Sequence, residues 1–162
     1  MENASKYTNK QELEAQGFIK TPRGIYKLNA LEQIYRNGRL EYGDKSFGGQ
    51  DRLRAGMKLA SDFEKSHFSI VNSSWQNEKV DCKFQNNNDI NYIRSRYYTA
   101  VNSIPREFWP AVRQICIENK IPDFKNIQSA RRRSENLYLR YFDLCRGLDR
   151  LIEHYLSRKI QF

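Results

Sequence analysis

The sequence SENLYLRYFDLCRGLDRLIEHY, residues 134–155, is the strongest helix signal in this chain. Its apolar residues recur at alternating four- and three-residue steps, which places them on one side of an α-helix. The members of this stripe are Leu137, Tyr141, Leu144, Leu148, Leu151 and Tyr155. Ser134 is a good amino-terminal cap and Glu135 complements the positive end of the helix dipole, so the helix is predicted to begin near Ser134. Further apolar residues widen the stripe, which favours an intramolecular core over a homodimer seam, the alternative reading.

Four other segments show apolar residues at helical spacing, near residues 28–37, 53–65, 89–101 and 108–120. In the second, the apolar face is predicted to hold Leu53, Met57, Ala60 and Phe63. The solvent face is predicted to hold Arg52, Arg54, Lys58, Asp62 and Lys65. Strand-like alternation of comparable length does not occur. The sequence therefore predicts an all-α, compact multi-helix domain of about six helices, with a helix-turn-helix-like unit near the carboxy terminus.

The domain organisation follows from where these patterns begin and stop. Residues 1–26 are mostly polar and contain Pro22 and Gly24, so they are predicted to form a polar amino-terminal arm. Residues 27–162 are predicted to form a single helical domain. Periodicity is lost near residues 67–89, where a loop or flexible segment is expected.

A strong positive charge narrows the class of partner. The chain has 28 Lys and Arg residues against 19 Asp and Glu residues, a net charge of +9. Such a balance favours an acidic partner, above all nucleic acid, although an anionic membrane surface would also explain it. Three arginines stand together in the stretch Ser129-Ala130-Arg131-Arg132-Arg133-Ser134. A phosphate backbone would neutralise them, whereas the alternative is a solvated cationic loop.

These features together predict a double-stranded DNA-binding protein and transcriptional regulator. The helix starting near Ser134 would be the reader of a helix-turn-helix unit, supported by residues 108–120 or 124–129. The predicted DNA-contacting residues are Lys125, Arg131, Arg132, Arg133, Ser134, Asn136 and Arg140. Arg and Asn side chains have the donor and acceptor geometry to read guanine or adenine edges, while Lys125 is expected to bind phosphate.

Two other functions stay open at this point. Aromatic residues make up 13% of the chain, with ten tyrosines, and binders of RNA or single strands stack bases on exposed rings. Tyr98 and Tyr138 are expected to leave the core face. The second alternative is a protein-interaction adaptor that docks on RNA polymerase or another transcription protein.

Enzymatic motifs are not apparent, so an enzyme is not expected, and neither a metal nor a cofactor is predicted. Cys82, Cys116 and Cys145 fit neither a disulfide framework nor metal-ligand spacing, and Cys116 and Cys145 are interpreted as core residues. His154 is interpreted as a packing or capping residue near a helix end. Apolar runs are too short for a membrane span and the first residues are too polar for a secretion signal, so a cytoplasmic, nucleoid-associated protein is expected.

Four segments resemble a helical domain family of unknown function that is widespread in alphaproteobacteria and forms the DNA-binding part of the gene transfer agent activator. These segments are Leu53-Arg54-Ala55-Gly56-Met57-Lys58-Leu59-Ala60-Ser61-Asp62-Phe63-Glu64, Ile93-Arg94-Ser95-Arg96-Tyr97 leading to Ile104-Pro105, Val112-Arg113-Gln114-Ile115-Cys116, and Leu148-Asp149-Arg150-Leu151-Ile152-Glu153-His154-Tyr155. The resemblance implies a compact helical DNA-binding regulator, and an activator role would imply contact with the transcription machinery.

Overall fold

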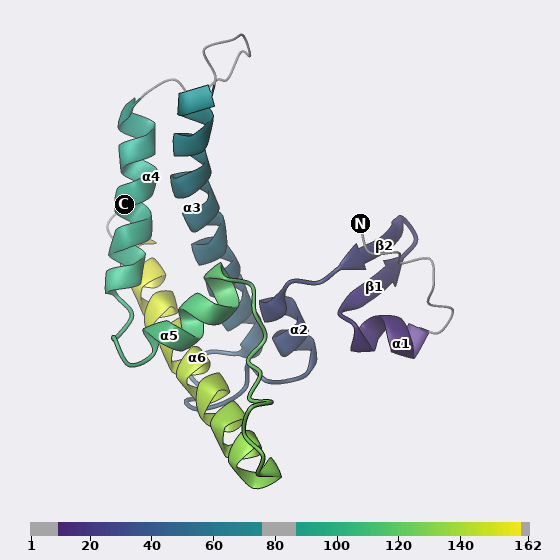
Figure 1. The fold of residues 1–162 in the computed structure, drawn as a ribbon. Helices are drawn as coiled ribbons and strands as arrows, with labels where there is room; N and C mark the ends of the chain where they lie inside the picture. Colours follow the sequence, from purple (N-terminus) through teal and green to yellow (C-terminus); the bar gives the residue numbers. More distant parts are fainter. Residues whose placement is uncertain (1–9, 76–86, 160–162) are drawn as a thin grey trace.

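The computed structural model describes residues 10–75 and 87–159, most of which lie in helices (Figure 1). In chain order the elements are α1 (Lys10–Ala15), β1 (Phe18–Thr21), β2 (Gly24–Lys27), α2 (Ala30–Arg36), α3 (Gly49–Trp75), α4 (Asn87–Asn102), α5 (Trp109–Val112), the π-helix η2 (Arg113–Ile117) and α6 (Ala130–Lys159). The prediction of a mainly helical, multi-helix fold is confirmed.

Part of the predicted polar arm is folded. β1 and β2 pair in an antiparallel hairpin, with Phe18 opposite Lys27 and Thr21 opposite Gly24. The hairpin was not predicted, because the turn residues between β1 and β2 were interpreted only as an interruption. Gly24 adopts a φ of 138°, which side-chain-bearing residues rarely reach, so the turn depends on glycine there. α1 packs on this hairpin through the buried Leu13, and the unit lies beside the helical body in Figure 1.

Helix α2 has well-formed ends. The Asn29 side chain accepts a hydrogen bond from the Glu32 amide at 2.8 Å, and the Glu32 carboxylate accepts one from the Asn29 amide at 2.9 Å. This capping box satisfies two amides that the helix itself leaves free. The sequence Asn37-Gly38 predicts a carboxy-terminal stop for this helix, because glycine tolerates the left-handed conformation. The structure confirms this stop, since Gly38 has a φ of 69°. Asn119, itself at a φ of 53°, accepts a further hydrogen bond from the Ala30 amide at 2.7 Å.

Helix α3 differs most from the prediction. It continues to Trp75, and residues 87–89 belong to α4, so much of the expected irregular segment is helical; residues 76–86 lie outside the described residues. The buried face of α3 is also displaced from the predicted one. It holds Arg52, Ala55, Leu59, Asp62 and Ser66, whereas Met57 is exposed. The solvent-face assignment of Arg52 and Asp62 was therefore wrong.

The core lies where α6 crosses the antiparallel α3–α4 pair, with α2 and α5 on its sides (Figure 1). Its largest fully buried aliphatic side chains are Ile34, Leu40, Leu59, Val112, Ile115, Leu144, Leu148 and Leu151. Burying each of the larger ones contributes about 1.5–3 kcal/mol. Cys116 and Cys145 are buried here as predicted. Gly147 lets α5 approach α6 closely, because a Cβ there would lie 2.5 Å from Val112 Cγ2.

Candidate nucleic-acid interface

The three clustered arginines lie inside a helix and not in front of one. α6 begins at Ala130, and the Ser129 hydroxyl accepts a hydrogen bond from the Arg132 amide at 3.4 Å. Ser129 is thus placed as the cap, and the prediction that Ser134 caps this helix was wrong. Arginine has a high helix propensity, so the helix extends through the cluster to the earlier serine.

This start of α6 lies at one end of the molecule, opposite the end at which α3 finishes and α4 begins (Figure 1). We call the seven predicted contact residues here the α6-terminus surface: Lys125, Arg131, Arg132, Arg133, Ser134, Asn136 and Arg140. Four of them are exposed, namely Lys125, Arg131, Arg132 and Ser134, and the other three are half-buried. The structure therefore brings the predicted residues together on one helix end and its preceding loop.

Acidic partners compensate only part of the positive charge of the α6-terminus surface. Arg131 pairs with Glu135 at 3.0 Å, and Lys125 pairs with Asp123 at 3.3 Å. Both pairs are well exposed, and such pairs are worth about 0–1 kcal/mol, so an anion can displace them. Within residues 10–75 and 87–159, Arg132, Arg133 and Arg140 form no salt bridge, although Arg140 lies near the carboxyl of Asp143. Burial raises the pKa of Asp143, and the charge of Arg140 acts in the opposite direction.

The helix dipole makes this arrangement unfavourable in the absence of an anion. The first turn of α6 carries arginines and no acidic residue. Free amides at a helix start give it a partial positive charge, so each cation placed there costs about 0.3–1 kcal/mol. The same amides and guanidinium groups together attract phosphate.

A helix-turn-helix unit is not confirmed. The proposed support helix is divided into the short α5 and η2, and residues 118–129 then connect η2 to α6. A helix-turn-helix joins its helices by about three to four residues, so this connection is much longer. The first turns of α6 therefore form a projecting helix end and not the second helix of such a unit.

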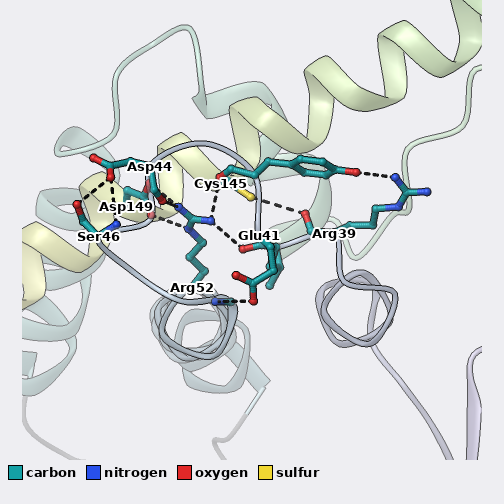
Figure 2. Close-up of polar contacts among 10 residues, drawn as sticks. Arg39, Glu41, Asp44, Ser46, Arg52, Cys145 and Asp149 are labelled. Carbon is teal, nitrogen blue, oxygen red and sulfur yellow. Dashed lines mark hydrogen bonds and ion pairs between the residues drawn. The ribbon is translucent and has the colours of Figure 1, made fainter.

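The structure also shows a buried ion pair that the sequence did not reveal (Figure 2). Arg52 is 1% exposed and binds Asp149 of α6 through Nε to Oδ1 at 2.6 Å and Nη2 to Oδ2 at 2.9 Å. Its remaining N–H groups donate to the backbone carbonyls of Leu40, Tyr42 and Asp44 at 2.8, 2.9 and 2.6 Å. All five donors of the guanidinium are thus used.

This contact set, the Arg52 clamp, fixes the loop between α2 and α3 against α6. Burial raises the pKa of Asp149, while the hydrogen bonds and charge of Arg52 act in the opposite direction. A second pair joins α3 to α4, since Arg96 donates through Nε to Asp62 Oδ2 at 3.1 Å and through Nη2 to the other oxygen. A usable sequence signal existed: Arg52, Asp62 and Ser66 continue the spacing of Ala55 and Leu59.

The clamped loop presents aromatic and basic side chains beside the α6-terminus surface. Tyr42 packs edge-on against Tyr138 at a centroid distance of 5.1 Å and parallel to Tyr141 at 6.4 Å. Arg39 Nη1 donates to the Tyr42 hydroxyl at 2.5 Å. Tyr98 and Tyr138 are both about half exposed, as predicted, at 54% and 50%. Sequence reasoning found Tyr138 but not its neighbours from the loop.

The two cysteines that the structure describes, Cys116 and Cys145, are buried. Burial raises the pKa of the Cys116 thiol to about 12, so it stays protonated and unreactive at neutral pH. Cys82 lies in the segment that the structure does not describe. His154 is half-buried beside Tyr155, and neither its Nε2 nor the Tyr155 hydroxyl has a hydrogen-bond partner among the described residues. Across residues 10–75 and 87–159, His, Cys, Asp and Glu side chains do not gather in threes as metal ligands.

Among the described helices, none combines the length and apolar character needed to cross a bilayer. Comparison with known proteins gives no significant match to a family model, to a curated protein or to a solved structure.

Proposed function

We propose that this protein binds double-stranded DNA through the α6-terminus surface and acts as a transcriptional regulator. The observation that carries the proposal is the trio Arg131, Arg132 and Arg133 in the first turn of a projecting helix, with no acidic residue in that turn. Folding alone disfavours cations at this helix end, whereas a phosphate backbone relieves both their repulsion and the dipole.

The size of the helix end suits a duplex. An α-helix is about 10–12 Å across with its side chains and the major groove is about 12 Å wide, so the first turns of α6 fit the groove. Arg132, Asn136 and Arg140 are four residues apart and share one side of the helix. In the proposed complex, Asn136 and Arg140 reach base edges, while Arg131, Arg132, Arg133 and Lys125 hold phosphates.

Membership of the alphaproteobacterial helical family is part of this proposal. The quoted segments fall largely on the core, because Leu148, Leu151 and Ile152 are buried and Asp149 belongs to the Arg52 clamp. They would accordingly specify the scaffold, and the α6-terminus surface would supply the DNA contacts. As a regulator, the protein would work at the nucleoid with RNA polymerase or another transcription protein.

Salt-dependent binding tests the surface directly. Fluorescence anisotropy with a labelled duplex would be measured from low to moderate salt for the wild type and for a variant with Arg131→Ala, Arg132→Ala and Arg133→Ala. Since each phosphate contact contributes about 0.9 to the log–log slope, the variant should lose roughly three units of slope and bind more weakly.

A variant with Lys20→Ala, Arg23→Ala and Lys27→Ala removes the same charge from the exposed hairpin and serves as the control. It should keep the wild-type slope. An arginine-cluster variant that binds like the wild type would remove this surface from the mechanism. A wild-type protein that leaves duplexes unbound at low salt would reject DNA binding, and capture of a transcription protein instead would favour the adaptor function.

A base-reading role is tested on the preferred site, which sequencing of DNA recovered with the tagged protein would define. Asn136→Ala should cost about 1–3 kcal/mol on that site and little on random DNA. An equal loss of affinity on the preferred site and on random DNA would show that Asn136 contacts the DNA backbone and not a base.

A further inference from the structure

Four rings form a cluster on the side of α6 that faces the clamped loop. We call Tyr42, Tyr138, Tyr141 and Phe142 the aromatic platform. Tyr138 is its outermost member at 50% exposure, held edge-on by Tyr42 at 5.1 Å and roughly parallel to Phe142 at 6.3 Å. A ring supported by other rings is presented with little freedom to turn away, so its exposed part is a preformed stacking surface.

The platform carries a cation. Arg39 is exposed, donates to the Tyr42 hydroxyl, and its guanidinium carbon lies 5.9 Å from the centroid of the Tyr141 ring. No salt bridge engages Arg39 within the part of the chain that the structure describes. An exposed ring beside an uncompensated guanidinium is the combination with which proteins bind a base and its phosphate.

The Arg52 clamp keeps this surface in shape. Tyr42 and Arg39 belong to the stretch between α2 and α3, and surface loops are ordinarily mobile. Here Arg52 holds the carbonyls of Leu40, Tyr42 and Asp44. Tyr42 is therefore placed against Tyr138 before any ligand arrives, which reduces the entropy lost on binding.

The platform is also aligned with Arg131 of the α6-terminus surface. Arg131 and Tyr138 are seven residues apart, two helical turns or about 10 Å, and project from the same side of α6. A DNA strand that leaves a duplex held at Arg131 would thus pass over Tyr138 and reach Arg39.

We propose that the aromatic platform stacks an unpaired base of DNA next to the duplex bound by the α6-terminus surface, so that the protein prefers forked or locally opened DNA. This inference rests on the proposed duplex binding and adds the structural class of the substrate. Tyr138 provides the stacking face, and Arg39 holds the phosphate that follows the stacked base.

The test compares a blunt duplex with a fork of the same nucleotide count, with 2-aminopurine at the first unpaired position. Base stacking on an aromatic ring is worth roughly 5- to 150-fold in affinity, so the wild type should prefer the fork by a factor in that range and quench the 2-aminopurine emission. Tyr138→Ala should lose the preference and the quenching, with blunt-duplex affinity unchanged. Tyr138→Phe should retain both.

Tyr92→Ala is the matched control, because Tyr92 is an exposed tyrosine on α4, away from the platform. It should behave like the wild type. Equal binding of fork and blunt duplex by the wild type, or a fork preference that survives Tyr138→Ala, would overturn the inference and leave duplex binding standing. If neither DNA is bound at low salt, the proposed function and this inference both fall.

Discussion

Removing both members of the Arg52–Asp149 pair should not restore the stability lost by removing one. Asp149→Leu leaves the buried guanidinium uncompensated, and breaking such a pair costs about 3–5 kcal/mol. In many proteins, replacing both partners by apolar residues is close to neutral. Arg52 also donates to three backbone carbonyls, so Arg52→Met leaves those acceptors without their donor whether or not Asp149 is present.

Each buried acceptor left unpaired costs about 1–3 kcal/mol, although water can reach some of the three. The free energy of unfolding of the double variant, Arg52→Met with Asp149→Leu, should therefore be lower than that of the wild type by at least about 2 kcal/mol. Urea denaturation followed by helical circular dichroism measures this. Arg150→Met, which breaks an exposed pair with Glu153 at 2.9 Å, is the control and should change the free energy of unfolding by less than about 0.5 kcal/mol. A double variant within about 1 kcal/mol of the wild type would refute the role of the carbonyl contacts.

Three further outcomes are expected. Arg132→Glu places an anion at the start of α6, so it should stabilise the fold by about 0.3–1 kcal/mol, measured by thermal melting. The same substitution should weaken duplex binding, measured by anisotropy. An unchanged melting temperature would contradict the dipole argument. Burial, with the charges of Arg158 and Lys58, lowers the pKa of His154 below its ordinary 6.5, so the unfolded chain takes up a proton first as the pH falls. Stability should therefore decline below about pH 6.5, and His154→Gln should reduce that decline in melts between pH 7 and pH 5, whereas an equal decline would exclude His154 as the cause. Gly147→Ala gains about 1 kcal/mol of helix propensity, but the new methyl group meets the stiff Val112 side chain and this overpacking should cost about 1–3 kcal/mol of stability. The variant should therefore be less stable in urea denaturation. A more stable variant would show that α5 moves to make room for the methyl group.

Local patterns predicted the helices whose buried faces are apolar. The α6 stripe from Leu137 to Tyr155 needs only its own spacing, and the stop of α2 at Gly38 needs only its own backbone. The prediction of the buried face of α3 was wrong because that face is not purely apolar. Its inward positions include Arg52 and Asp62, whose burial depends on partners in α6 and α4. The carboxylate that pairs with Arg52 lies 97 residues further along the chain, so the local sequence around Arg52 does not indicate that this arginine is buried.

The candidate site shows the same division. The basic cluster and the exposed Tyr138 could be read from composition and helical phase. The start of α6 could not, because Ser129 and Ser134 are both competent caps and the choice between them depends on how residues 118–129 lead into the helix. Tyr42 and Arg39 were missed because their place beside α6 depends on the Arg52 clamp.

The way in which Arg52 grips its loop has an evolutionary consequence. The guanidinium recognises main-chain oxygens at positions 40, 42 and 44, and every amino acid supplies such an oxygen. Substitutions at positions 42 and 44 can accumulate without breaking these hydrogen bonds, because the bonds do not depend on which side chain stands there. The backbone shape of the loop can therefore be conserved while its surface side chains change. Descendants of this chain could diversify what the loop contacts by drift in a few codons, while one arginine and one aspartate preserve its geometry.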